Sequence, residues 1–175
     1  VASAGARGLV GAAFGLAPGD EGFPALRDAF LDRYAERLLS QTRVFDAVDT
    51  LLAALDSAGL RWGIVTNKAM RFTAPIVAGL GLAERAAAVV AGDSTPHIKP
   101  HPEPLLHAAR AVGVDPNRCA YVGDDLRDMQ AGRAAGMATL VAAWGYLGHG
   151  EPIDAWGADQ VLAEPAALLN WLESA

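Results

Sequence analysis

The feature that most constrains this sequence is the alternation of short apolar runs with helix-length segments from Arg61 onward. Strands joined by helices need crossover connections, which make the strands parallel and cover both faces of the sheet. The pattern therefore predicts a doubly wound α/β domain. The predicted strands are Trp62–Val65, Ala87–Ala91, Arg118–Val122, Ala138–Ala142 and Gln160–Leu162, with helices at about 70–80, 103–112, 126–135 and 165–173.

The amino-terminal part of the sequence is predicted to be helical. Between residues 23 and 39 the apolar side chains recur every three or four positions, and charged residues fill the opposite face. These apolar residues are Phe23, Leu26, Phe30, Tyr34 and Leu38. A further helix begins at Asp46 and ends at Gly59, a residue suited to the left-handed position after a helix. We expect residues 1–42 to form part of a helical cap and residues 43–175 to form the α/β core domain.

Composition excludes several classes of partner and site. A formal charge of -6 and a pI near 5.1 argue against nucleic acid, whose affinity for proteins depends on Lys and Arg. The single cysteine, Cys119, excludes an internal disulfide and a cysteine-based zinc cluster, and it fits a cytoplasmic protein. No run approaches the roughly 18 apolar residues that a membrane-spanning helix needs, so we expect no membrane partner.

Polar side chains follow the first two predicted strands, at the edge where an open parallel sheet binds ligands. Thr66 and Asn67 come directly after the first strand, and a hydroxyl followed by a helix start suits a phosphate oxygen. Taken alone, Thr66 is also explained as a helix cap. Lys99 follows the second strand, where three prolines within five residues fix a rigid turn. A lysine is normally a solvated surface charge, but this one is held on a stiff backbone.

The segment after the third predicted strand carries Asp124, Asp125 and Asp128, three carboxylates within five residues. Such crowding is tolerated when a cation neutralises it, and oxygen ligands at a strand end suit Mg²⁺. The alternative is that Asp124 or Asp125 caps the following helix while Asp128 lies in its first turn. His97 and His101 lack a further His or Cys at ligand spacing, so we interpret them as loop residues.

Taken in order, these segments resemble the haloacid dehalogenase superfamily. Its second, third and fourth signature motifs are similar to Val65-Thr66-Asn67, Lys99-Pro100 and Gly123-Asp124 with Asp128. The runs Ile64 to Lys68, Lys99 to Pro104 and Val122 to Asp124 resemble the phosphoglycolate phosphatase branch, in which a small helical cap follows the first strand. The resemblance covers essentially all 175 residues and implies a Rossmann-like core with that cap.

The first motif of the superfamily, Asp-x-Asp-x-Thr, does not occur in the 175 residues. The resemblance places its strand in the middle of the sheet, between the strands that end at Thr66 and Asp124. Without it, those strands face each other across a gap lined with unpaired backbone groups. We therefore expect roughly 30 to 45 further residues before Val1, the length of a strand, its loop and one cap helix. We also expect the 175 residues by themselves to have negligible phosphatase activity.

The resemblance implies a magnesium-dependent phosphatase that hydrolyses a small phosphate monoester, foremost 2-phosphoglycolate, through a phosphoaspartate. In this implied mechanism Thr66 and the backbone of Asn67 hydrogen-bond the phosphoryl oxygens, and Lys99 neutralises developing charge. The first Asp of the absent motif attacks phosphorus, and the second Asp is the general acid and base.

The resemblance also implies roles for the acidic residues and for the cap. Asp124 binds Mg²⁺, Asp128 orients Lys99 or a water molecule on the metal, and Asp125 supports the metal site. Arg7 is the candidate to meet a glycolate carboxylate through its bidentate fork. The alternative for Arg7 is a solvated position on a helix face.

Three other functions compete with this one. A dehalogenase of the same superfamily needs no metal, and the acidic cluster counts against it. A sugar-phosphate mutase or phosphatase is a second alternative, and kinetics with phosphoglycolate and with hexose phosphates would separate it from a phosphoglycolate phosphatase. A non-catalytic module that has lost its nucleophile is distinguished by the DNA upstream of Val1: an immediate start codon would indicate such a module, whereas codons for Asp-x-Asp followed by Thr would indicate an enzyme.

Overall fold

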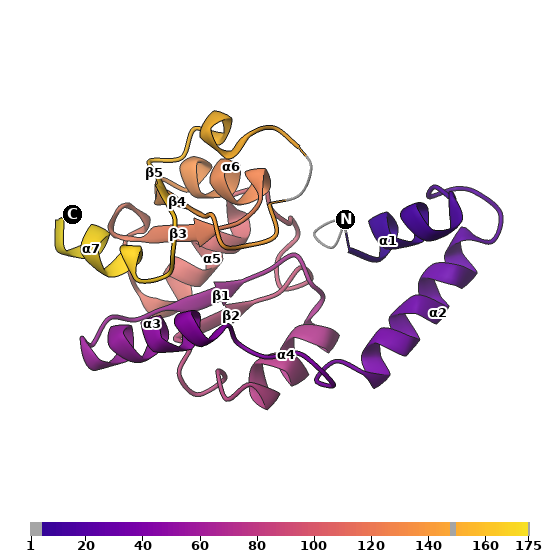
Figure 1. The fold of residues 1–175 in the computed structure, drawn as a ribbon, viewed down its shortest axis with the longest axis horizontal. Coiled ribbons are helices and arrows are strands. Elements are labelled where there is room, and N and C mark those ends of the chain that lie inside the picture. Colours follow the sequence, from indigo (N-terminus) through magenta and orange to yellow (C-terminus); the bar gives the residue numbers. More distant parts are fainter. Residues whose placement is uncertain (1–4, 148–149, 175) are drawn as a thin grey trace.

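The computed structural model describes residues 5–147 and 150–174, and it has the alternating α/β order that the sequence predicts (Figure 1). The elements are α1 (Gly5–Phe14), α2 (Phe23–Glu36), α3 (Asp46–Ser57), β1 (Gly63–Val65), α4 (Met70–Gly79), β2 (Ala88–Val90), α5 (Glu103–Val112), β3 (Ala120–Gly123), α6 (Leu126–Ala134), β4 (Ala138–Ala142), β5 (Gln160–Leu162) and α7 (Ala167–Ser174). Two short 3₁₀ turns cover Pro116–Arg118 and Ile153–Trp156.

Every strand pair is parallel, as connections through helices require. β1 pairs with β2, β3 pairs with β4, and β4 pairs with β5. The predicted strands are confirmed in kind and order. The third was expected to begin at Arg118, but that residue belongs to a 3₁₀ turn whose start is capped by the side chain of Asp115. The strand therefore begins two residues later and ends at Gly123.

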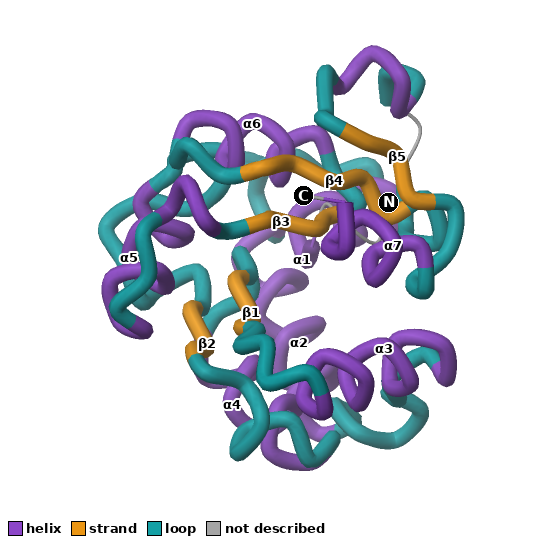
Figure 2. The backbone as a smooth tube through the Cα atoms, turned by 90° about the vertical axis from the view of Figure 1, so that its left-hand side faces the viewer, coloured by secondary structure: helices purple, strands orange, loops and turns teal. Residues whose placement is uncertain are grey.

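Helices cover both faces of the strands (Figure 2). Successive strand residues point to opposite faces, and β3 follows this rule. Tyr121 packs with α5 and α6 around Leu105, whereas Val122 packs with α3 and α7 around Leu140. A smaller cluster around Met129 and Trp156 closes the outer side of α6. The doubly wound arrangement predicted from the sequence is therefore present.

The strands form two sheets, β1-β2 and β3-β4-β5, and no strand pairing joins β1 to β3. A groove of about 760 Å³ lies between them. Its lining is mainly apolar and comes from both sheets and from the helices on either face, including Leu51, Leu55, Val65, Tyr121, Val122 and Leu172. This agrees with the expectation that the strands ending at Thr66 and Asp124 lie on opposite sides of a gap.

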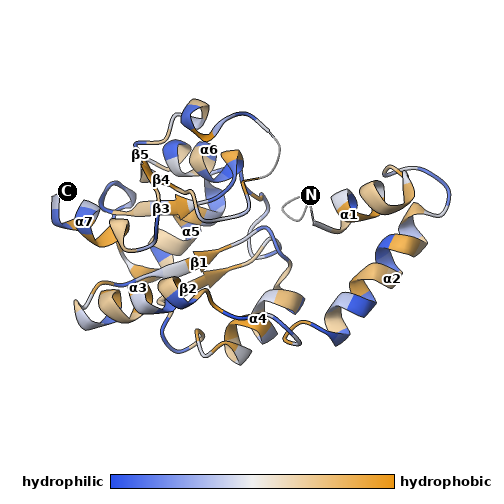
Figure 3. Ribbon diagram, in the orientation of Figure 1, coloured by the Kyte–Doolittle hydropathy of each residue, from blue (hydrophilic) through white to orange (hydrophobic). Residues whose placement is uncertain are grey.

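Helices α1 and α2 pack on each other and project to one side of the α/β core (Figure 1). We call them the helical arm (residues 5–36). Val10 and Phe23 are buried between them, with exposed fractions of 2% and 5%. Hydrophilic and hydrophobic residues alternate along α2, whereas the strands of the core are largely hydrophobic (Figure 3). Within residues 5–147 and 150–174, no helix has both the length and the apolar character needed to cross a membrane.

The chain returns from the helical arm to the core through α3. This helix begins at Asp46 as predicted, and Gly59 just beyond its end has a φ of 67°. A left-handed residue at this position ends the helix, which is the role that the sequence assigns to Gly59. Leu51 and Leu55 bury the inner face of α3 against the core.

Candidate active site

Two hydrogen bonds between Asn67 and the main chain of Lys99 join the loops that follow β1 and β2. Asn67 Nδ2 donates to Lys99 O, and Lys99 N donates to Asn67 Oδ1, each at 2.9 Å. The sequence predicted a rigid turn from the prolines beside Lys99. The structure shows that the side chain of Asn67 also anchors this turn to the end of β1.

The ammonium group of Lys99 is enclosed by three acceptors. Lys99 Nζ lies 2.8 Å from Asp128 Oδ1, 2.7 Å from Tyr121 Oη and 3.0 Å from Val65 O. An ammonium group has three N–H donors, so each can be satisfied here. Lys99 is 9% exposed and Asp128 is 6% exposed. We call Lys99, Asp128, Tyr121 and the Val65 carbonyl the Lys99 cluster; it fixes the Lys99 ammonium group, as an ion pair with Asp128, at the carboxyl end of the strands.

Asp128 links this charge to the start of α6. Its Oδ2 accepts hydrogen bonds from the backbone N–H groups of Asp124 and Asp125, both at 3.2 Å, while its Oδ1 faces Lys99. Asp125 and Asp128 together form a capping box at the first turn of α6. The structure thus brings Asp128 into contact with Lys99, the residue that it was predicted to orient.

The carboxylate of Asp125 is engaged by Arg127. Arg127 Nε donates to Asp125 Oδ1 at 2.8 Å, and Arg127 Nη2 donates to Asp125 Oδ2 at 2.7 Å. The backbone N–H of Arg127 also donates to Oδ1. The Arg127 hydrogen bonds lower the pKa of Asp125. Asp125 therefore acts as the helix cap that the sequence offered as the alternative. A supporting role for Asp125 at a metal site stays a prediction, and it would require the ion pair with Arg127 to open.

Asp124 lies against the loop that follows β4. The backbone N–H of Tyr146 donates to Asp124 Oδ2 at 2.7 Å. A Cβ at Gly145 would collide with the side chain of Asp124, so a larger residue there would displace it. The loop that follows β4 thus contacts Asp124 closely and restricts its orientation.

The acidic residues fit a hard cation at Asp124. Asp128 uses both oxygens within the protein, Asp125 is paired with Arg127, and Asp124 accepts one hydrogen bond. Mg²⁺ in phosphoryl-transfer sites takes one or two carboxylates and fills its other positions with water and substrate phosphate. Within the described ranges, no three His, Cys, Asp or Glu residues gather as a ready-made metal site.

Thr66 sits at the end of β1 and does not cap α4. Its N–H donates to Val90 O at 2.9 Å, and its Oγ1 accepts from Lys68 N at 3.1 Å. The first turn of α4 is instead capped by Asp93, whose Oδ1 accepts from Met70 N at 2.7 Å. The hydroxyl hydrogen of Thr66 can therefore be donated to another acceptor, as a phosphate contact requires.

The sequence reasoning missed two tyrosines of this site. Tyr121 Oη bridges Lys99 and Val65 O, and burial together with the charges of Asp128 and Asp124 raises the pKa of Tyr121 well above its usual value. Tyr146 contacts Asp124 through its backbone. Their positions in the sequence could have indicated both. Tyr121 lies inside a strand that ends at the site, and Tyr146 follows β4 at the same edge of the sheet.

Arg7 is the remaining predicted site residue, and it makes no hydrogen bond or ion pair with the Lys99 cluster. Arg7 is exposed on α1, and no hydrogen bond or ion pair joins it to another described residue; Ser3 and Ala4, predicted to reach toward substrate with it, lie outside the described residues. His97 and His101 are exposed, and their rings stack with centroids 4.2 Å apart. The interpretation of both histidines as loop residues agrees with this arrangement.

Comparison with known proteins decides the family. The family model described as haloacid dehalogenase-like hydrolase matches residues 2–136. This chain belongs to that family. An N-acetylmuramic acid 6-phosphate phosphatase of Pseudomonas aeruginosa is 46% identical over 100% of this chain and 77% of its own length. A phosphoglycolate phosphatase of Xylella fastidiosa is 47% identical over 79% of this chain and 61% of its own length.

The solved structures agree with this family assignment. A crystal structure from Haemophilus somnus, described as a predicted phosphoglycolate phosphatase, superposes with a TM-score of 0.83 at 27% sequence identity. It covers 97% of this chain, which in turn covers 75% of that structure. The predicted family, the α/β fold and the phosphatase class of this haloacid dehalogenase-like hydrolase are thereby confirmed.

Proposed function

We propose that this protein is a magnesium-dependent phosphatase that hydrolyses a small phosphate monoester through a phosphoaspartate. The observation that carries the proposal is the Lys99 cluster, which holds a buried ammonium group beside the segment that contains Asp124. Phosphoryl transfer depends mainly on positioning and on neutralising the charge of the phosphoryl oxygens. An ammonium group held in place by Asp128, next to an oxygen ligand for a metal, would supply both once the metal is bound.

Each residue at this edge has a distinct role in the proposal. The hydroxyl group of Thr66 donates a hydrogen bond to a phosphoryl oxygen, and the backbone N–H of Asn67 donates another. Lys99 acts through its charge, because Asp128 and the other acceptors hold its ammonium group in place. Asp124 holds Mg²⁺, which when bound neutralises further phosphoryl charge.

The groove between β1 and β3 offers a place for the strand that would carry the nucleophile. A parallel strand in that groove would pair with both facing edges and cover the apolar side chains that line it. Its carboxyl end would lie between Thr66 and Asp124. We propose that a strand with the Asp-x-Asp-x-Thr motif, which is absent from the 175 residues, occupies this place and presents the attacking carboxylate.

Two substrates are candidates. N-acetylmuramic acid 6-phosphate is favoured because the relatives from Pseudomonas aeruginosa and Pseudomonas putida that are named for it match 100% of this chain. The alternative is 2-phosphoglycolate, because the Xylella relatives named for that activity reach 46% and 47% identity over 79% of the chain. We propose residues 1–42 as part of the cap that discriminates between them, over the core formed by residues 43–175.

The test is a kinetic comparison on the product of the complete reading frame that encodes this sequence. Phosphate release from N-acetylmuramic acid 6-phosphate, 2-phosphoglycolate and glucose 6-phosphate is measured with Mg²⁺ and with EDTA. We expect magnesium-dependent release, highest for N-acetylmuramic acid 6-phosphate. Interconversion of hexose phosphates would indicate a mutase. A reading frame without Asp-x-Asp, together with no turnover, would indicate a non-catalytic module.

A further inference from the structure

The helical arm and the core are joined by a contact between Tyr34 of α2 and Lys68, which follows β1. Lys68 Nζ donates to Tyr34 Oη at 2.8 Å and lies 4.6 Å from the centroid of the same ring. Among the described residues, this is the one side-chain hydrogen bond between the helical arm and residues 43–174. The two residues are 34 positions apart, so the contact reflects the fold and not local sequence.

Lys68 is anchored to the core at its main chain. Its carbonyl accepts from Gly92 N at 2.8 Å and from Thr73 Oγ1 at 3.2 Å. Its N–H donates to Thr66 Oγ1 at 3.1 Å. The base of the lysine is therefore fixed beside the threonine that the proposed function assigns to phosphate, while its ammonium group reaches the helical arm.

Tyr34 is positioned by aromatic neighbours on both sides. Its ring meets Phe72 of α4 edge to face, with centroids 5.5 Å apart, and stacks with Phe30 of α2 at 6.2 Å. Phe72 is 6% exposed and belongs to the core. A tyrosine with an apolar body and a polar tip suits such a junction, because the ring packs and the hydroxyl meets a charge.

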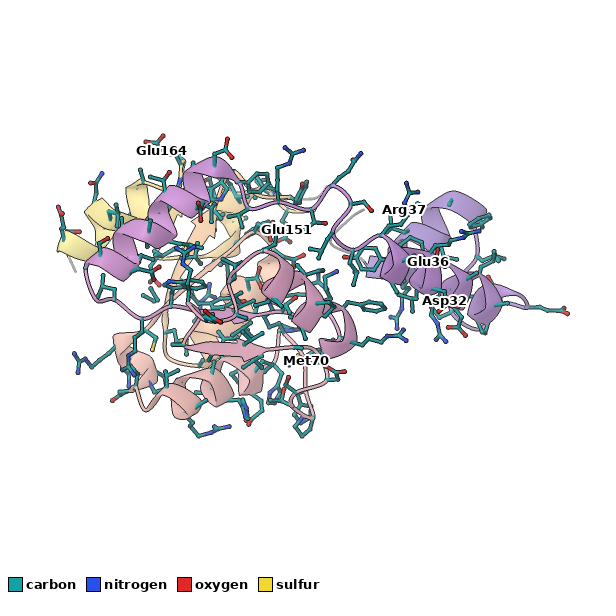
Figure 4. The ribbon with its side chains drawn as sticks, turned by 90° about the horizontal axis from the view of Figure 1, so that it is seen from below. Asp32, Glu36, Arg37, Met70, Glu151 and Glu164 are labelled. Carbon is teal, nitrogen blue, oxygen red and sulfur yellow. The ribbon has the colours of Figure 1, made fainter. Side chains whose placement is uncertain are left out.

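The surroundings of this contact are polar on the arm side. Figure 4 shows Asp32, Glu36 and Arg37 projecting from or just beyond α2, with Met70 at the start of α4 on the core. All three arm residues are exposed. On the arm side the Tyr34–Lys68 contact is thus flanked by solvated side chains, while the ring of Tyr34 packs on the buried Phe72 of the core.

We propose that Tyr34 and Lys68 are positioning residues that set the place of the helical arm over the Thr66 and Lys99 edge of the core. The proposal rests on the proposed function, in which the arm is part of the cap. Lys68 links the helical arm to the site, because its side chain contacts Tyr34 and its backbone N–H donates to Thr66, the proposed phosphate contact. Loss of the contact leaves the phosphate residues in place but lets the arm take many orientations.

A distance measurement on the full chain tests this directly. Spin labels are attached at Asp32→Cys on α2 and Ala111→Cys on α5, both exposed, in a Cys119→Ser background. Pulsed electron spin resonance then gives the distribution of label distances. We expect one narrow distribution in the parent and a broad one in Tyr34→Phe and in Lys68→Met. Lys68→Arg, which keeps a cationic donor, should restore the narrow distribution.

Arg33→Met is the matched control, because Arg33 neighbours Tyr34 in the sequence but pairs with Glu36 of the same helix. It should leave the distribution narrow. Unchanged distributions in both Tyr34→Phe and Lys68→Met, or a parent that is already as broad as these variants, would overturn the proposal. Thermal melting checks that each variant is folded, and Tyr34→Phe removes one oxygen atom only.

Kinetics of the complete enzyme provide the second readout. Tyr34→Phe should lower kcat/KM for the cap-recognised substrate by about fivefold, as expected for a misplaced binding element. The change for p-nitrophenyl phosphate, which needs little recognition beyond its phosphate, should be smaller. Equal losses on both substrates would contradict a positioning role. A complete enzyme that hydrolyses neither substrate, but shows the broadened distances, would refute the proposed function and leave the contact standing.

Discussion

The two lysines of this sequence occupy opposite environments. Lys99 is 9% exposed, and its ammonium group is bound by Asp128, Tyr121 and the Val65 carbonyl. Lys68 is exposed and reaches Tyr34 on the helical arm. A buried charge must keep its partners, whereas an exposed charge can exchange a partner for water. The core region therefore uses lysine as a fixed element of the site, and the arm region uses it as a reversible attachment.

The largest difference between the two regions should appear when each lysine is replaced by methionine. Lys99→Met leaves Asp128 buried without its partner, so we expect the free energy of unfolding to fall by about 3–5 kcal/mol. In the complete enzyme, turnover should fall by about 10²-fold or more, because one charge-stabilising group is lost. Urea denaturation and steady-state kinetics measure the two effects.

Lys68→Met is the comparison variant. It removes an exposed contact, so its effect on the free energy of unfolding should stay below about 1 kcal/mol. Near-normal turnover in Lys99→Met would remove that lysine from the mechanism. Equal destabilisation by the two substitutions would show that burial does not separate these regions.

The next largest effect concerns the metal and separates two neighbouring acids. A ligand at 100 times its Kd stabilises the folded state by about 2.7 kcal/mol. We expect saturating Mg²⁺ to stabilise the parent chain and Asp125→Asn alike, because Asp125 is paired with Arg127. Asp124→Asn should lose this stabilisation. Thermal melting with and without Mg²⁺ measures it, and loss in Asp125→Asn instead would move the metal to Asp125.

The sequence predicts the core better than it predicts the contacts within the site. Apolar runs reveal strands because burial on two faces requires them, and β4 and β5 have the predicted bounds. The spacing of Thr66, Lys99 and Asp128 locates the edge of the sheet where Lys99 and Asp128 meet and where β1 ends beside Thr66. Spacing cannot tell a metal ligand from a helix cap, however, because both place acids at a strand-to-helix junction, and Asp125 is bonded as a cap.

Long-range contacts were beyond the reach of the sequence pattern. Tyr121 reads as an ordinary strand residue, yet it meets the Val65 carbonyl 56 positions earlier in the chain. The Tyr34–Lys68 contact likewise depends on how the helical arm meets the core. In both cases a hydroxyl selects its partner through packing of elements that are distant in sequence, and periodicity carries no information about that choice.

Matched removal of the two tyrosine hydroxyl groups sharpens the comparison further. Tyr121→Phe deletes two buried hydrogen bonds, one from the Lys99 ammonium and one to the Val65 carbonyl, so we expect a loss of about 2 kcal/mol in the free energy of unfolding. Tyr34→Phe deletes one bond to exposed Lys68 and should cost less, about 1 kcal/mol. Chemical denaturation of both variants under one set of conditions measures the difference, and a reversed order would contradict it.

The smallest expected effect is the pH dependence of the Asp125–Arg127 pair. The pKa of Asp125 is lowered in the folded state by its hydrogen bonds with Arg127, so the pair contributes stability above the unfolded pKa of about 3.9 and loses it as pH falls. Asp125→Asn keeps a good helix cap while removing the charge. Because the Arg127 side chain is 41% exposed, we expect a loss below about 1 kcal/mol at pH 7. The unfolding free energies of the parent and the variant should converge once the pH falls below the lowered pKa of Asp125 in the folded state. Curves that stay parallel down to that pH would show that the cap, and not the ion pair, carries the contribution of Asp125.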